Sequence, residues 1–160
     1  MSHLGSKTYV IGSDNNGYAL KMELRAFLDS EGVPYEDLGV CGPDDDTMYP
    51  VIAERVARAI RDSGYVKNGI LVCGTGIGMC IAANKFKGIY AAVCHDIYSA
   101  ERARLSNDTN VIAMGAQIVG PVLAVRLLSR WLSLEYVDGR STPKILRIRE
   151  IENREMREKA

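Results

Sequence analysis

The sequence predicts a single α/β domain, in which a five-stranded parallel sheet lies between two layers of helices and a further helix follows at the C-terminus. Short apolar runs alternate with amphipathic segments along the whole chain, an order typical of βα units joined by crossovers. Three of these runs are nearly continuously apolar, as expected for strands covered on both faces. The 160 residues are enough for one domain with its own core. We therefore expect a Rossmann-like, three-layer α/β/α fold.

Five segments have the length and apolar character of strands: 8–13, 34–39, 69–74, 90–94 and 110–115. Five amphipathic segments between and after them are expected to be helices: 18–30, 50–63, 77–86, 97–106 and 121–134. Leu20, Leu24 and Leu28 share one face of the first helix, and Pro50 suits the first turn of the second.

The last segment, 143–160, places Ile145, Ile148 and Ile151 on one stripe amid dense charge. This pattern predicts an amphipathic helix that packs on its own domain or on a partner subunit. At the other end, the residues MSHLGS (1–6) look like an expression tag, so we assign the domain to 7–160.

Composition excludes several classes of function. Twenty basic residues balance twenty acidic ones, so the chain lacks the charge excess of a protein that binds nucleic acid or an anionic membrane. No apolar run has the length of a bilayer span, and no signal-peptide pattern opens the chain, so we expect a cytoplasmic protein. The four cysteines form no C-x-x-C pair and no zinc spacing, which argues against a metal site.

The stretch GILVCGTGIGMCIAANK (69–85) is the most informative in the chain. A dinucleotide-binding fingerprint needs glycine at position 79, and a cysteine phosphatase needs arginine there, but the residue is Met79. The Walker sequence for phosphate binding is also absent. A glycine-rich loop remains, with Cys73 at the end of a strand and a helix beginning after the loop.

Such a loop can turn its backbone N–H groups towards a ligand, because glycine permits close approach. A helix N-terminus favours negative charge, either on a bound phosphate or on an anion formed during reaction. The same field favours the thiolate form of Cys73. A thiolate beside an oxyanion hole suits acyl transfer, redox chemistry or proton abstraction next to a carbonyl. A structural glycine turn beside a core cysteine is the alternative.

Three stretches together resemble the ribose-5-phosphate isomerase B family, which includes the galactose-6-phosphate isomerase subunits: GSDNNGYALK (12–21), CGTGIGMCIAANK (73–85) and SNDTNVIAMGAQIVG (106–120). The resemblance implies an aldose–ketose isomerase that works through a cis-enediolate without metal or other cofactor. It also implies a homodimer or a dimer of dimers with active sites shared between subunits. Ribose 5-phosphate and ribulose 5-phosphate are the expected pair of sugars, with no nucleic-acid or membrane partner.

The resemblance also implies residue roles. Cys73 is the base that moves a proton between C1 and C2, and Thr75 assists the opening of the sugar ring. The N–H groups of the loop hold the enediolate oxygen, with Gly74, Gly76, Ile77 and Gly78 as the residues concerned. The other residues expected to bind substrate are Asp14, Asn15, Tyr49, Asn107, Arg140 and Lys144.

This chain departs from the family pattern where histidine and arginine are usual. Asn15, Ser106 and Ser141 stand where histidines are expected, the one before Asn107 being the ring-opening group. Gln117 and Lys144 replace arginines. Lysine exchanges a bidentate contact for a point charge, so the phosphate site is less cationic than usual.

These departures leave three functions open: a sugar-phosphate isomerase, an isomerase of a different or unphosphorylated sugar, and a sugar-binding relative without activity. His95 follows the fourth expected strand. It either takes over ring opening as a catalytic residue or is a structural histidine before Asp96.

Overall fold

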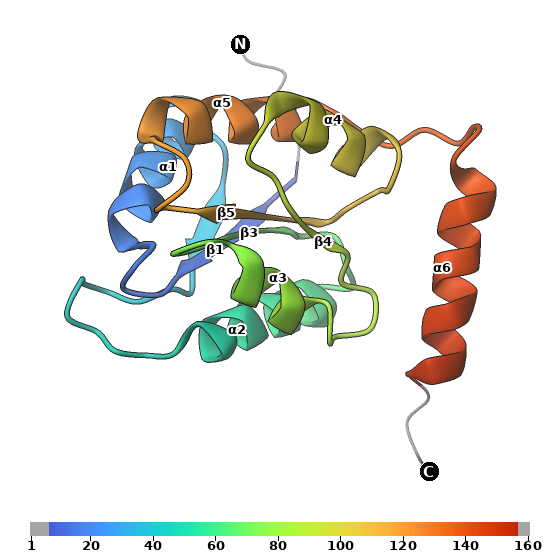
Figure 1. Cartoon of the computed structure of the whole chain (residues 1–160), viewed down its shortest axis with the longest axis horizontal. Coiled ribbons are helices and arrows are strands. Elements are labelled where there is room, and N and C mark those ends of the chain that lie inside the picture. The colour runs from blue at the N-terminus through green and yellow to red at the C-terminus, as the bar shows by residue number, and fades with distance from the viewer. Residues whose placement is uncertain (1–6, 157–160) are drawn as a thin grey trace.

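The computed structural model describes residues 7–156, so the tag assigned to 1–6 and the last four residues of the predicted tail helix lie outside the described part. The described chain forms one parallel sheet with helices on both faces (Figure 1). Its strands lie in the order β2-β1-β3-β5-β4, and every neighbouring pair is parallel. The strands are β1 (Tyr9–Ser13), β2 (Tyr35–Asp37), β3 (Asn68–Cys73), β4 (Ala91–Val93) and β5 (Val111–Gly115). The predicted five-stranded parallel sheet is confirmed.

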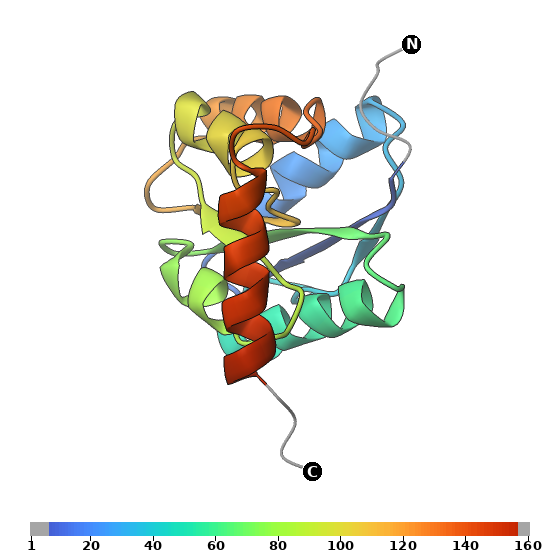
Figure 2. The ribbon, with the colours of Figure 1, turned by 90° about the vertical axis from the view of Figure 1, so that its right-hand side faces the viewer.

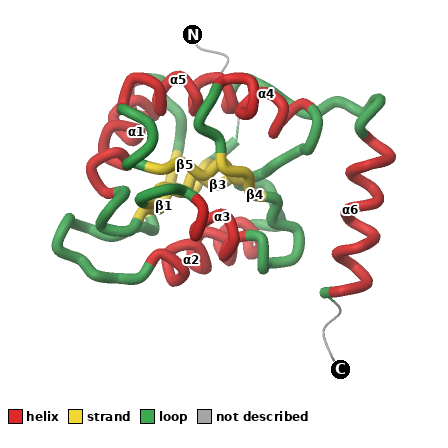
Figure 3. The backbone as a smooth tube through the Cα atoms, in the orientation of Figure 1, coloured by secondary structure: helices red, strands yellow, loops and turns green. Residues whose placement is uncertain are grey.

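Two groups of helices cover the two faces of the sheet, as the tube in Figure 3 also shows. One face packs against α1 (Tyr18–Ser30), α4 (Ile97–Leu105) and α5 (Pro121–Leu132). The other packs against α2 (Tyr49–Asp62) and α3 (Ile77–Ala83). The three-layer α/β/α architecture is therefore confirmed.

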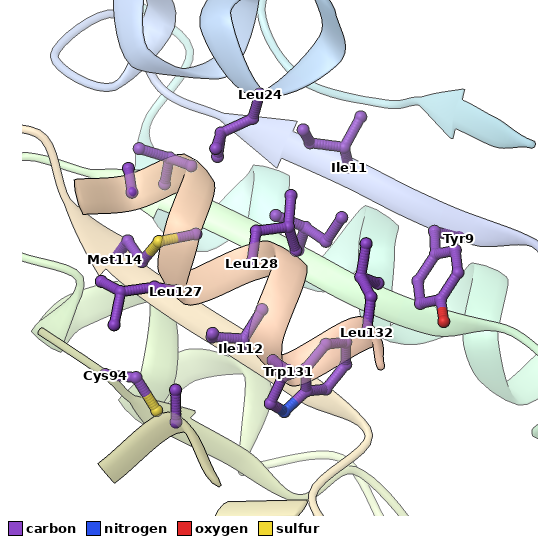
Figure 4. Close-up of a cluster of buried hydrophobic side chains, with 14 of the residues drawn as sticks. Tyr9, Ile11, Leu24, Cys94, Ile112, Met114, Leu127, Leu128, Trp131 and Leu132 are labelled. Atoms are coloured by element: carbon purple, nitrogen blue, oxygen red, sulfur yellow. The ribbon is translucent and has the colours of Figure 1, made fainter. Parts of the chain in front are cut away.

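The three central strands are buried along their whole length. Every residue of β1, β3 and β5 is buried, as their nearly continuous apolar pattern predicts. On the α1/α5 side, the Trp131 ring meets the Tyr9 ring edge-on at 6.3 Å between centroids, within the cluster drawn in Figure 4. The Trp131 indole N–H donates to the Thr109 hydroxyl at 3.1 Å, which satisfies the buried polar atom.

Helix α3 is shorter than the predicted 77–86 because Asn84 ends it. The Asn84 side chain accepts a hydrogen bond from the Ala91 N–H at 2.8 Å and donates one to the Ala91 carbonyl at 2.9 Å. This pair of contacts ties the end of α3 to the first residue of β4. A side chain that bonds backbone beyond its own helix favours a helix end over helix continuation.

Helix α6 (Thr142–Glu155) lies beside the β4 edge of the sheet and apart from both helix layers (Figures 1 and 2). Ile145 is buried, but Ile148 and Ile151 on the predicted apolar stripe are 44% and 42% exposed. Polar contacts attach the helix to its own domain. Glu152 accepts hydrogen bonds from the Gly88 N–H at 2.8 Å and the Tyr90 hydroxyl at 2.7 Å. Two of the three residues of the predicted stripe therefore remain exposed in one chain.

Among residues 7–156, no helix combines the length and apolar character needed to cross a bilayer.

Candidate active site

Cys73 is the last residue of the central strand β3 and is almost fully buried. It lies in register with Gly115, the last residue of β5. The carboxyl ends of parallel strands form the edge where α/β proteins bind ligands. The sheet therefore places the Cys73 thiol at that edge, with the ends of β1 and β5 on either side.

The glycine loop folds back over this thiol. The Gly76 N–H donates a hydrogen bond to Cys73 Sγ at 3.1 Å. Gly76 has a φ of 77°, in the left-handed region that glycine adopts without strain, and a Cβ there would lie 2.9 Å from the Met114 carbonyl carbon. Glycine is thus needed at 76 for the backbone to reach the sulfur.

A pocket of about 440 Å³ opens beside the thiol. Its lining combines the ends of β1 and β3, the glycine loop, and side chains from α2 and α3: Asp14, Asn16, Tyr49, Cys73, Gly74, Thr75, Ile77, Gly78, Ile81 and Gln117. Buried Asp14 accepts a hydrogen bond from the Gly17 N–H at 2.9 Å through one carboxylate oxygen. No lysine or arginine lines this pocket in the described chain. We name it the Cys73 pocket.

A second pocket, of about 550 Å³, lies between α4 and α6. The residues that line it are Tyr98, Arg102, Leu105, Ser106, Asn107, Val137, Arg140, Ser141, Lys144, Ile145 and Ile148. Three of them are cations and none is a carboxylate, so this pocket suits an anion. We name it the Asn107 pocket.

The predicted site residues thus divide into two groups within one chain. Asp14, Tyr49, Cys73 and Thr75 line the Cys73 pocket with Gly74, Ile77 and Gly78. Asn107, Arg140 and Lys144 line the Asn107 pocket. Gly76 supports Cys73 without lining either pocket.

Two other predicted residues line neither pocket. Asn15 is exposed, and its neighbour Asn16 lines the Cys73 pocket instead. His95 Nε2 accepts a hydrogen bond from the Gly115 N–H at 2.9 Å. Burial lowers the pKa of His95 below its ordinary value, and the nearby Asp96 carboxylate opposes the shift.

Sequence reasoning missed Asn16, Ile81 and Gln117 as lining residues. Gln117 carries the clearest signal, because it follows the end of β5 and its N–H donates to the Gly74 carbonyl at 2.9 Å. Met79 is fully buried in the core between α2, α3 and the sheet. It takes no part in either pocket.

Comparison with known proteins places this chain and its fold in one family. The model of the ribose/galactose isomerase family matches residues 9–148. D-erythrulose-4-phosphate isomerase from Pectobacterium atrosepticum is 45% identical over 145 residues, which cover 91% of this chain and 95% of that protein. Ribose-5-P isomerase B from Listeria innocua is 46% identical over 144 residues, 90% of this chain and 96% of that one.

Among solved structures, ribose-5-phosphate isomerase B of Clostridium thermocellum superposes with a TM-score of 0.87 at 41% identity, covering 92% of this chain and 98% of that one. The chain belongs to the ribose/galactose isomerase family, and the resemblance noted in the sequence is confirmed.

Proposed function

We propose that this protein is an aldose–ketose isomerase for a sugar phosphate, with Cys73 as the base. The observation that carries the proposal is the placement of Cys73 Sγ. The sulfur lies at the carboxyl end of β3, accepts the Gly76 N–H at 3.1 Å and borders a pocket of about 440 Å³. Hydrogen bonds with an ionised partner are roughly twice as strong as neutral ones, so the Gly76 N–H suits a sulfur that carries negative charge during the reaction.

The reaction moves one proton between two carbons. The Cys73 thiolate takes the proton from C2, the released electron pair forms the C1–C2 double bond, and the carbonyl electrons move to O1. The thiol then returns the proton to C1, O1 gains a proton, and O2 loses its proton to become the ketone. A positioned base contributes about 10²–10⁴-fold, and one good oxyanion donor contributes about 10²–10³-fold.

The remaining residues of the Cys73 pocket have supporting roles in this proposal. The N–H groups of the loop stabilise the negative charge on the enediolate oxygen, and Asp14 binds a hydroxyl of the sugar. Thr75 is exposed at the pocket, where its hydroxyl assists the opening of the sugar ring in this proposal. Tyr49, 41% exposed, forms one wall.

We also propose that the Asn107 pocket of a second copy completes the site, in a homodimer or a dimer of dimers. The Cys73 pocket has no cation of its own, whereas the Asn107 pocket has Arg140 and Lys144. A hydrogen bond to a charged group contributes roughly 1.5–3 kcal/mol, so a sugar phosphate at Cys73 needs these side chains. Exposed Ile77 and Ile81 beside the first pocket, and exposed Ile148 on α6, suit burial between copies.

A hybrid experiment tests this arrangement. Cys73→Ala and Arg140→Ala are each expected to be inactive, and the two variants are mixed after unfolding and refolding together. If sites are shared in a two-fold dimer, random pairing restores one intact site in half of the dimers, or about a quarter of wild-type activity. A mixture no more active than its two parents would contradict sharing.

The substrate is tested with a panel. The relatives named above differ in their sugars, a pentose phosphate in one case and a tetrose phosphate in the other. Wild-type protein is incubated in D₂O with ribose 5-phosphate, D-erythrose 4-phosphate and galactose 6-phosphate, and with the unphosphorylated sugars. For at least one aldose phosphate, we expect a ketose product and deuterium at C2 of the recovered aldose. Exchange on a free sugar alone would favour an isomerase of unphosphorylated sugars, and no exchange at all would favour a sugar-binding relative.

A further inference from the structure

A further pocket, of about 380 Å³, lies at the edge of the sheet opposite to the Cys73 thiol. Its lining includes Asn68, the first residue of β3, and Tyr90 and Asn110, which directly precede β4 and β5. These positions are the amino ends of parallel strands, whereas Cys73 is at the carboxyl end of β3. At about 3.3 Å per residue, the length of β3 separates the two sites by roughly 17 Å. We name this pocket the amino-edge pocket.

The lining of the amino-edge pocket is positively charged. Lys7, Arg104 and Arg149 line it, and Asp108 is the one carboxylate of its lining in the described chain. Asp108 Oδ2 pairs with Arg149 Nη2 at 3.1 Å. Three cations against one carboxylate leave the lining with a net charge of +2. The pocket therefore suits an anion.

Arg104 is a buried guanidinium without an ion pair. It is 4% exposed, and its Nε and Nη1 donate to the backbone carbonyls of Leu134 and Thr109. Among residues 7–156, its other terminal nitrogen, Nη2, has no hydrogen-bond partner. Burial lowers the pKa of Arg104, and the carboxylates of Asp108 and Glu135 oppose the shift from beyond ion-pair distance. Buried charges are normally paired, so this cation leaves two N–H donors and a positive charge for a ligand.

A second donor at this pocket has no partner. Asn68 lines the pocket and is 3% exposed, and its amide nitrogen Nδ2 makes no hydrogen bond within the described chain. A buried amide N–H without an acceptor is unfavourable, and such groups usually have a partner. The hydroxyls of Tyr65 and Tyr90, which also line the pocket, already donate to acceptors of the chain. Asn68 and Arg104 therefore remain available to a ligand.

We propose that the amino-edge pocket binds the phosphate group of a small phosphorylated molecule, held by Arg104, Arg149 and Asn68. These three residues come from α4, α6 and β3, so their donors approach from different elements. A phosphate monoester carries about −1.5 to −2 charges at neutral pH and has three oxygens that accept hydrogen bonds. Its charge matches the net +2 of the lining, and the planar fork of a guanidinium fits phosphate oxygens in pairs.

The size and the place of the pocket limit the ligand further. Its volume of about 380 Å³ lies near the lower end of the range for small-molecule sites, roughly 300–1,000 Å³. The ligand is therefore a small molecule. Because the Cys73 thiol lies at the opposite edge of the sheet, a molecule bound here is not positioned for reaction at that thiol. The amino-edge pocket thus holds an additional ligand beside the substrate.

Calorimetric titration with inorganic phosphate tests this site. The background variant combines Arg140→Ala with Lys144→Ala, which removes two cations of the Asn107 pocket. In this background we expect saturable binding of one phosphate per chain. Adding Arg149→Ala should weaken that binding at least about tenfold, the factor for one hydrogen bond to a charged group. Arg147→Ala is the matched control, because Arg147 is on the same helix but lines neither pocket, and we expect it to leave the affinity unchanged.

Asp108→Asn gives a change in the opposite direction, which a loss of structure would not produce. Asp108 has a φ of 50°, in the left-handed region that asparagine also adopts. The substitution removes the carboxylate that competes for Arg149, so phosphate should bind about fivefold tighter, the factor for one unit charge at close range in water. Thermal melting checks that each variant folds.

Three results would overturn the proposal. They are no saturable phosphate binding in the background variant, equal affinities after Arg149→Ala and Arg147→Ala, and weaker binding after Asp108→Asn. Since calorimetry measures binding and not isomerase activity, these results leave the function proposed above untouched.

Discussion

The N–H of Gly76 donates to the sulfur of Cys73 at 3.1 Å, across a loop that returns over the end of its own strand. The contact exists because Gly76 has a left-handed backbone, φ 77°, which brings its N–H above the sulfur. The loop and the thiol are therefore coupled, and we expect a change in the loop to move the Cys73 thiol.

Gly76→Ala should impair catalysis more than folding. The left-handed backbone costs an L-residue roughly 1–2 kcal/mol, and the new Cβ would lie 2.9 Å from the Met114 carbonyl carbon, so the loop must shift away from Sγ. Gly32→Ala is the matched control, because Gly32 has a φ of 66° but nothing within 4 Å of an added Cβ. Chemical denaturation and kcat are measured for both. Equal loss of activity in the two variants would contradict the coupling of loop and thiol.

Gly78→Ala should raise KM through Tyr49. An added Cβ at 78 would lie 2.5 Å from the Tyr49 ring, so the ring must move, and that ring is one wall of the Cys73 pocket. We expect an increase of about tenfold in KM, equivalent to roughly 1.4 kcal/mol. In a Tyr49→Ala background the same substitution should have little further effect, as a double-mutant cycle would show. Additive effects would mean that Gly78 acts through another contact.

His95 should make stability depend on pH. The unfolded imidazole titrates near its ordinary pKa of 6.5, and burial lowers the pKa in the folded protein. Between these two pKa values the unfolded state binds more protons than the folded state. The contribution of His95 to stability is therefore complete above pH 6.5 and is lost as the pH falls towards the pKa of the folded protein. His95→Gln keeps an acceptor for the Gly115 N–H but does not titrate. Melting temperatures between pH 7.5 and 5 should fall more steeply for wild type; parallel curves would contradict the prediction.

Glu152→Ala should loosen α6. Glu152 accepts the Gly88 N–H and the Tyr90 hydroxyl, and burial together with this carboxylate raises the pKa of Tyr90. Losing a charged acceptor from two donors should cost about 1–3 kcal/mol. Hydrogen exchange in α6 should quicken, and KM should rise because Lys144 lies on the same helix.

The control for this change is Glu150→Ala, two residues away on the same helix. Among residues 7–156, the one ion-pair partner of Glu150 is Arg147 at the surface, where the Glu150 side chain is 62% exposed. Such exposed pairs contribute little. Matching exchange rates in the two variants would show that α6 is not held through Glu152.

The sequence predicts the layers well because each rests on a local pattern. The runs that became β1, β3 and β5 are apolar at nearly every position, and all of their residues are buried. Cys73 and Asp14 could be placed at one edge of the sheet, because the carboxyl ends of parallel strands share that edge. Helix bounds agree within a few residues, except where Asn84 bonds to Ala91 and shortens α3.

Sequence patterns could not predict that the expected site residues divide between two pockets. Asn107 and Cys73 both lie in the motifs that resemble the family, yet they line different pockets. The spacing of apolar residues predicts which face of an element a side chain occupies, but not how far that side chain lies from another element. Helix α6 shows the same limit. Ile148 and Ile151 share the predicted stripe with Ile145 but remain exposed, since the polar contacts of Glu152 set the position of the helix. Strand order, with β5 between β3 and β4, is likewise a tertiary property.

Exchange of the C2 proton with D₂O by Cys73→Ser tests the central claim most directly. Serine keeps the size of the side chain and can accept the Gly76 N–H, but it is not ionised at neutral pH. Cys80→Ser, a half-buried thiol outside both pockets, is the control. With the aldose phosphate that wild type uses best, the account predicts that Cys73→Ser slows exchange by about 10²–10⁴-fold while Cys80→Ser stays near wild type. Exchange by a folded Cys73→Ser at the wild-type rate would contradict the assignment of Cys73 as the base.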